Sequence, residues 1–99
     1  MPTDDQRRYP RSEACLFGTQ IIGSQRLPRE VINISAGGFF VSVEPPSVRP
    51  GELVLVEFED AAGPFVVTGE VAFITDVGFG VRATRADWRR LNELIRERS

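Results

Sequence analysis

The stretch VINISAGGFF, residues 31–40, carries the pattern that decides the fold. Two short runs rich in β-branched and aromatic residues flank a pair of glycines, Gly37 and Gly38. Such runs are typical of β-strands, and glycine permits the backbone conformations that a tight turn requires. The stretch therefore predicts two strands joined by a turn at the glycine pair.

Small polar side chains interrupt this apolar stretch at alternate positions. In an extended chain Asn33 and Ser35 point to one face of the strand, and Ile32 and Ile34 point to the other. We therefore expect the isoleucines to serve a core while the polar pair faces outward. The neighbouring glycines would let the backbone turn and come close to whatever the polar pair touches.

Outward from this stretch, the same kind of pattern recurs along the chain. A proline-rich loop at 44–52 separates the strands, because proline lacks the N–H group that an interior strand position needs. Apolar alternation predicts six short strands, at 13–23, 29–35, 38–43, 53–60, 65–75 and 77–83. Short strands with turn signals between them indicate an all-β chain, either a small antiparallel barrel or a sandwich.

Alternation also predicts which side chains enter the core. We expect Cys15 to be a small core residue, and we favour a core position for Phe73 over a role in stacking against a ligand. The expected core residues on the last three strands are Val54, Val56, Phe58, Phe65, Val67, Val71, Phe73, Val77, Phe79 and Val81. The carboxylates of Glu57 and Glu59 should face water.

In the last segment the apolar residues recur every three or four positions instead of every two, which predicts an α-helix at about 85–97. Thr84 and Asp87 have the spacing of a capping box. The apolar stripe expected to pack on the barrel consists of Trp88, Leu91, Leu94 and Ile95. The arginines around this stripe are expected to form a solvated face.

Size and composition exclude several functional classes. A chain of 99 residues is one domain, with neither a membrane-spanning apolar run nor a signal-peptide segment, so we expect a soluble cytoplasmic protein without membrane insertion. The chain has one Cys and no His, so it lacks the side chains that usually form zinc sites and nucleophile–base pairs. We therefore expect no metal, no cofactor and no enzyme activity. The segment 78–83, GFGVRA, fits a dinucleotide-binding pattern, but too few residues follow it for the required βαβ unit. Its glycines are interpreted as hairpin and barrel-corner residues.

Charge is segregated along the chain. The net charge is +1 over residues 1–11, −6 over 12–81 and +3 over 82–99. The amino-terminal cations, Arg7, Arg8 and Arg11, surround an aromatic residue and a proline in the sequence RRYPR. We expect residues 1–12 to form a flexible basic arm and residues 13–99 to form the folded domain. A solubilising tail is the alternative for the arm, and a turn stabilised by local hydrogen bonds is the alternative for Asn33 and Ser35.

These two motifs suit a guanine ligand that carries phosphates. The planar guanidinium of Arg binds phosphate oxygens in bidentate fashion and also fits the O6/N7 edge of guanine. The amide of Asn33 offers an acceptor for the donors on guanine's Watson–Crick edge. The arm and the polar pair would therefore read a guanine together.

Taken together, the motifs resemble the paired signature of PilZ domains, bacterial receptors for the second messenger cyclic di-GMP. The resemblance rests on Arg7-x-x-x-Arg11 followed by Asn33-x-Ser35-x-x-Gly38. It continues through RPGELVLVEF (49–58) and GEVAFITDVGFGVRA (69–83), and so covers nearly the whole chain. It implies a six-stranded antiparallel β-barrel with a C-terminal helix.

The resemblance also implies roles for individual residues. Arg7 and Arg11, with Arg8 as a possible third contact, would clasp guanine edges and phosphates. Asn33 and Ser35 would hydrogen-bond one guanine, and Gly38 would permit close backbone approach. The expected function is that of a cyclic di-GMP receptor whose arm closes over the ligand and changes a surface read by an unidentified downstream protein.

Two alternatives remain open from the sequence. A nucleotide-independent interaction adaptor of the same fold would work through its helix or strand edges. A barrel that binds single-stranded DNA or RNA would use the basic ends and the aromatic residues. The acidic body opposes a groove that tracks phosphates, so DNA or RNA is the less favoured partner.

Overall fold

The computed structural model describes residues 16–35 and 37–98. The expected arm at 1–12 and the expected core residue Cys15 lie outside these described residues. Strands and helices follow in the order β1 Leu16–Ile22, β2 Gln25–Ser35, β3 Gly38–Ser42, β4 Leu53–Asp60, β5 Gly63–Thr75, β6 Gly78–Ala83, a 3₁₀ turn Arg85–Asp87 and α1 Trp88–Arg98. The helix expected at 85–97 thus begins with a 3₁₀ turn and becomes α-helical at Trp88.

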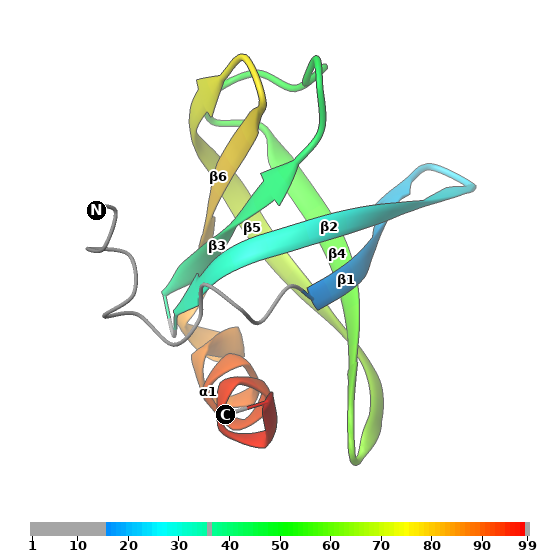
Figure 1. Cartoon of the computed structure of the whole chain (residues 1–99), viewed down its shortest axis with the longest axis vertical. Coiled ribbons are helices and arrows are strands. Elements are labelled where there is room, and N and C mark those ends of the chain that lie inside the picture. Colours follow the sequence, from blue (N-terminus) through cyan, green and yellow to red (C-terminus); the bar gives the residue numbers. More distant parts are fainter. Residues whose placement is uncertain (1–15, 36, 99) are drawn as a thin grey trace, which may run out of the picture.

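The strands close into an antiparallel barrel in the order β1-β2-β3-β6-β5-β4, which confirms the predicted fold class. The helix α1 lies at one end of the barrel, and the β1–β2 hairpin extends to one side (Figure 1). Closure between β1 and β4 is short, since only Thr19–Ile21 pair with Leu55–Glu57. By contrast, β4 pairs with β5 from Leu53 to Asp60.

An extra residue in β2 changes the faces expected for the opening stretch. The β2–β3 register shifts by one residue between Ile32 and Ser35, and Asn33 has a positive φ of 55°. Asparagine tolerates this left-handed conformation better than most residues, and such a bulge reverses the alternation of side chains. Ile34 packs against the core, but Ile32 pairs with Phe40 on the outer face, so the expected core position of Ile32 is wrong.

A second extra residue occurs in β5. Val71 pairs with Val81, but Phe73 pairs with Gly80, so Ala72 is the added residue. Because of this shift Val71 faces the core, whereas Phe73 lies on the outer face with 53% of its surface exposed. The core position favoured for Phe73 is therefore wrong, because the bulge breaks the period of two on which it rested.

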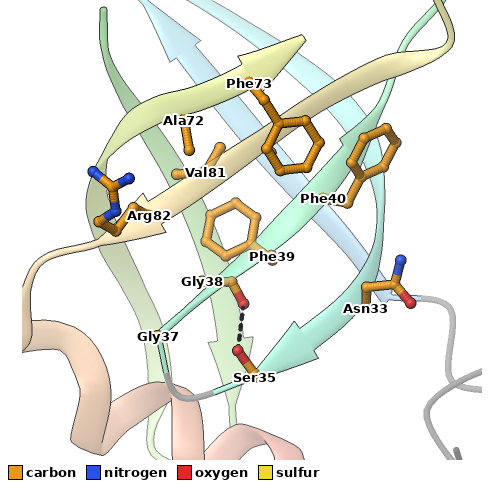
Figure 2. A pocket seen from close by; sticks show the side chains of 11 residues that line it. Asn33, Ser35, Gly37, Gly38, Phe39, Phe40, Ala72, Phe73, Val81 and Arg82 are labelled. Atoms are coloured by element: carbon orange, nitrogen blue, oxygen red, sulfur yellow. Dashed lines mark hydrogen bonds between the residues drawn. The ribbon is translucent and has the colours of Figure 1, made fainter. Parts of the chain in front are cut away.

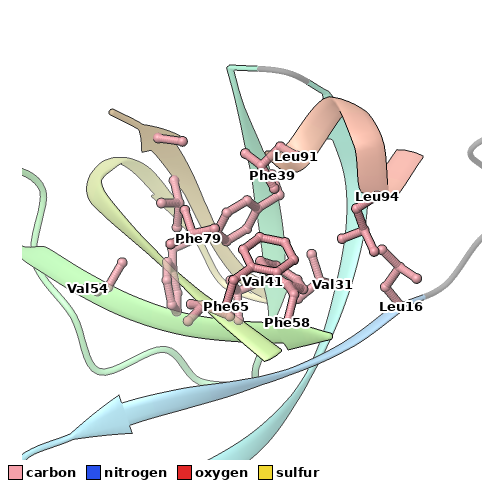
Figure 3. Packing of buried hydrophobic residues seen from close by; sticks show 14 of the residues in the cluster. Leu16, Val31, Phe39, Val41, Val54, Phe58, Phe65, Phe79, Leu91 and Leu94 are labelled. Atoms are coloured by element: carbon pink, nitrogen blue, oxygen red, sulfur yellow. The ribbon is translucent and has the colours of Figure 1, made fainter. Parts of the chain in front are cut away.

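The barrel interior is filled by side chains from every strand and from α1 (Figure 3). Phe58 contacts Phe39 edge-on, with ring centroids 5.3 Å apart, and Phe65 at 6.0 Å. Leu91 and Leu94 of α1 are fully buried in this cluster and cover one end of the barrel. Eight of the ten core positions expected on the last three strands are confirmed, and Phe73 and Val77 are the exceptions. Val77 is half exposed because it lies in the β5–β6 turn.

The start of the helix differs from the expected capping box. Thr84 makes no side-chain hydrogen bond to the backbone of the first turn. Instead, the carboxylate of Asp87 accepts hydrogen bonds from the backbone N–H of Thr68 at 3.0 Å and from the Thr84 hydroxyl at 3.3 Å. Trp88 donates its indole N–H to the carbonyl of Ala83 at 3.1 Å. Asp87 therefore attaches the start of the helix to β5, and Trp88 attaches it to β6.

The remainder of α1 is attached to the β4–β5 turn. Arg90 donates two hydrogen bonds of 3.1 Å to the carboxylate of Asp60, and its guanidinium lies 4.2 Å from the centre of the Phe65 ring. Glu97 accepts hydrogen bonds from the backbone N–H of Ala61. The hydrogen bonds from Arg90 hold the pKa of the Asp60 carboxyl below its ordinary value of 3.8, although burial by itself would raise it.

The Asp60–Arg90 pair should make stability depend on pH. With a lowered folded-state pKa, Asp60 binds its proton more readily in the unfolded chain, so its contribution is complete above pH 3.8 and is lost as pH falls through the folded-state value. We expect Asp60→Asn to lower the free energy of unfolding at neutral pH, and the difference from wild type to shrink in acid. Urea unfolding of both proteins across this range measures the effect. Glu93→Gln, which removes an exposed pair with Arg89, should have a smaller effect, and a pH-independent Asp60→Asn difference would contradict the assignment.

Candidate functional site

A depression on the outer face of the barrel collects the polar residues singled out in the sequence. It has a volume of about 310 Å³ and lies where β2, β3, β6 and β5 run side by side (Figure 2). Its lining residues are Asn33, Ser35, Gly37, Gly38, Phe39, Phe40, Ala72, Phe73, Gly80, Val81 and Arg82. The structure thus brings together Asn33, Ser35 and Gly38, three of the residues that the sequence predicted for a binding site.

The two polar side chains of β2 differ in how freely they can meet a ligand. Asn33 is exposed, and its amide makes no hydrogen bond within residues 16–35 and 37–98. The bulge directs it away from the core. Ser35 donates a long hydrogen bond of 3.5 Å to the carbonyl of Gly38. Ser35 thus makes a local hydrogen bond of the kind expected if the motif only stabilises a turn. The amide of Asn33, by contrast, keeps its donors and its acceptor available to a ligand.

The structure requires glycine at position 38 but not at position 37. A methyl group at Gly38 would overlap the carbonyl oxygen of Val81 on the neighbouring strand β6. A methyl group at Gly37 would meet nothing within 4 Å. The close backbone approach expected at Gly38 is thus made to β6, and it brings β3 and β6 together beneath the depression.

An aromatic pair on the outer face of the barrel, with Phe73 exposed and Phe40 partly buried, forms one wall of the site. The rings of Phe40 and Phe73 are stacked, with centroids 6.1 Å apart and planes inclined by 28°. Side chains at Gly78 and Gly80 would overlap these rings, Gly78 with Phe40 and Gly80 with Phe73. The two glycines of the GFGVRA segment therefore make room for aromatic side chains on the outside of the barrel.

A cation completes the rim. Arg82 follows Gly80 by two residues on β6, so its side chain is on the same outer face. Its guanidinium is 3.6 Å from the carboxylate of Glu70, and both side chains are largely exposed. Exposed ion pairs of this length contribute little, which leaves the guanidinium available to an anion.

Sequence reasoning missed Phe40 and Arg82 and placed Phe73 in the core. A usable signal was present in β6, where small residues at 78 and 80 alternate with the buried Phe79 and Val81. Glycine on the outer face of a strand often accommodates an aromatic side chain from a neighbouring strand. Arg7, Arg8 and Arg11, which complete the predicted site, lie outside the described residues.

The chain is thus a small antiparallel β-barrel domain with a depression on its outer face. The PilZ domain family matches residues 5–97, nearly the whole chain. The chain therefore belongs to the PilZ domain family, which is known for cyclic di-GMP receptors and whose domains serve in binding and adaptor roles. A search of curated proteins found no match.

Within the part of the chain that the structure describes, no three His, Cys, Asp or Glu side chains are grouped so that they could hold a metal ion. Across the same residues, no helix has the length and apolar character needed to cross a membrane.

The glycine pair allows a direct test of the packing beneath the site. We expect Gly38→Ala to destabilise the barrel by about 1–3 kcal/mol or more, the usual cost of overpacking, because its methyl group would overlap the β6 backbone. Gly37→Ala is the matched control and should stay within about 0.5 kcal/mol of wild type. Chemical denaturation measures both, and equal effects at the two positions would show that β3 does not need close approach to β6.

Proposed function

We propose that this protein is a cyclic di-GMP receptor in the bacterial cytoplasm, in which the arginine-rich amino-terminal segment closes over a ligand held in the depression. The observation that carries the proposal is the arrangement of Asn33 and Ser35 in one depression with a stacked aromatic pair and the exposed guanidinium of Arg82. Membership of the PilZ family supplies the class of ligand.

The polar side chains of β2 suit the edge of a guanine. The Asn33 amide has an oxygen that accepts from the N1–H and N2–H₂ donors of the base, and the Ser35 hydroxyl adds a second hydrogen-bonding group two residues away. Its present bond to Gly38 is 3.5 Å long, so exchanging it for a ligand contact has a small cost. Gly38 stays in the backbone wall beside them.

The aromatic pair and the rim cation suit the remaining parts of the ligand. A base laid on the exposed ring of Phe73 gains stacking energy, on the order of 1–3 kcal/mol per base for aromatic contacts of this kind. Arg82 offers a guanidinium to a phosphate in the geometry that favours bidentate binding. Neither contact depends on the segment outside the described residues.

Arg7, Arg8 and Arg11 would supply the other half of the clasp. Charge-assisted hydrogen bonds from these side chains would have to exceed the conformational entropy lost when the segment is ordered on the ligand. The closed segment and the barrel face would then present a new surface to a downstream protein. The domain acts by this change of surface, without catalysis and without a cofactor.

Titration calorimetry of the purified protein with cyclic di-GMP tests the proposal. We expect saturable binding that discriminates against a linear guanine dinucleotide and GTP. Arg11→Ala should weaken binding by about 5- to 150-fold, the effect of losing one bidentate contact of roughly 1–3 kcal/mol. Arg96→Ala, which removes an exposed cation from α1, is the control for net charge. An absence of binding would contradict the receptor role and favour a nucleotide-independent adaptor.

The aromatic wall gives a second prediction. We expect Phe73→Ala to weaken cyclic di-GMP binding by about 5- to 150-fold and Phe73→Trp to retain it, because stacking needs a flat ring at this position. Val66→Ala, another exposed apolar position on the outer face of β5, serves as the control. Calorimetry with all three variants decides the matter, and equal affinity of Phe73→Ala and wild type would remove Phe73 from the site.

A further inference from the structure

A second groove lies where strands β1 and β4 part. These strands pair only through Thr19–Ile21, so β1 from Leu16 to Gly18 and β4 from Phe58 to Asp60 are not bonded to each other. The opening has a volume of about 310 Å³. It is lined by Phe17, Thr19, Glu57, Phe58, Glu59 and Pro64.

This groove combines an uncovered aromatic ring with negative charge. Phe17 has 74% of its surface exposed, although the next residue inward on the groove, Phe58, is buried in the core. Glu30 lies directly opposite Phe17 on β2, and Glu59 lies across the opening on β4. Glu57 is held in an ion pair by Arg26, whereas the carboxylate of Glu59 has no ion-pair partner among the residues that the structure describes. An aromatic face beside carboxylates attracts guanidinium groups through both cation–π and ionic contacts.

The chain itself carries a segment of matching chemistry. The sequence RRYPR at residues 7–11 combines three arginines with an aromatic ring, and it precedes an acidic body of net charge −6. Its tether ends at the groove, because Phe17 lines the opening and Leu16 is the first described residue of β1. Arg8 is nine residues from Phe17, a reach of up to about 30 Å.

The residue at which this segment joins the barrel, Leu16, is also close in register to the proposed cyclic di-GMP site. Leu16 pairs with Val31, two residues before Asn33 on β2. In the order of the strands around the barrel, the β1/β4 seam is opposite the β3/β6 seam beneath the ligand-binding depression. A segment that leaves the barrel at Leu16 therefore has two destinations within reach, and it cannot occupy both.

We propose that, without ligand, the segment of residues 1–15 docks in the β1–β4 groove, with an arginine on Glu59 and Tyr9 against Phe17. Its role in regulation rests on the proposed function, because the arginines that hold the segment in the groove are those that would clasp cyclic di-GMP. The ligand must then compete with the groove for the same cations. Because the segment is tethered, its effective concentration is on the order of millimolar, so a weak contact is enough to populate the docked state.

A ligand-free experiment tests the docking by itself. We compare amide chemical shifts of the isotope-labelled full chain with those of the Arg7→Gln, Arg8→Gln, Arg11→Gln triple variant. Changes are expected at Glu57–Gly63, more than forty residues from the substitutions, and they should not appear in the control Arg49→Gln. Changes confined to residues before Thr19 would overturn the proposal. Changes in this region that grow with protein concentration would overturn it too, since they would identify a second copy as the occupant.

A binding experiment tests the competition. Glu59→Gln should tighten cyclic di-GMP binding by about 2- to 5-fold, because weakening an exposed ionic contact raises the fraction of chains whose arginines are free. Glu93→Gln on α1 changes the net charge equally but lies outside the groove, so it should not match this gain. Equal affinities of the two variants would overturn the competition. If cyclic di-GMP does not bind at all, the proposed function and the competition both fail, while the ligand-free shifts still decide whether the segment docks.

Discussion

The depression on this barrel exists because the alternation of side chains along two strands is interrupted by single extra residues. A β-strand sends successive side chains to opposite faces, so one added residue exchanges the faces of everything that follows. The bulge at Asn33 directs Ser35 outward while Ile34 enters the core. The bulge at Ala72 directs Phe73 outward after Val71 has faced inward. The two bulges lie on strands that flank β3 and β6, and the site is formed between them.

Close packing of β3 on β6 makes the floor of the depression, and α1 keeps the barrel closed at one end. Gly38 lacks the methyl group that would overlap the backbone of β6, and Gly80 leaves space for the ring of Phe73. At the helix, Leu91 and Leu94 fill the end of the barrel, while Asp60 and Arg90 hold α1 against the β4–β5 turn. The outer face is thereby supported by a core that does not share residues with the polar part of the site. Substitution at Asn33 or Arg82 consequently changes surface chemistry without opening a cavity.

Much of the fold could be predicted because it depends on local patterns. The strands around Val54, Val56 and Phe58 alternate without interruption, so their buried faces could be read directly. The buried face of the helix, which includes Leu91 and Leu94, could also be predicted, since its apolar residues recur with a period of about 3.6 along the helix. The role of Asp87 could not be predicted from the capping-box spacing, because its carboxylate can accept a hydrogen bond either from the first turn of its own helix or from a backbone N–H elsewhere. The N–H of Thr68 belongs to another strand and is invisible to a local pattern.

By itself, the sequence determined that this chain forms six short strands and a terminal helix, and which small polar residues stand beside a glycine pair. Periodicity, turn residues and spaced motifs are properties of positions close together in the chain, so they can be recognised in the amino-acid sequence alone. Tertiary structure alone decided that Phe73 faces outward, that Phe40 stacks on it and that Arg82 joins the same depression. Those outcomes depend on register between strands, and register is set by backbone contacts between residues such as Gly38 and Val81 that lie far apart in the chain.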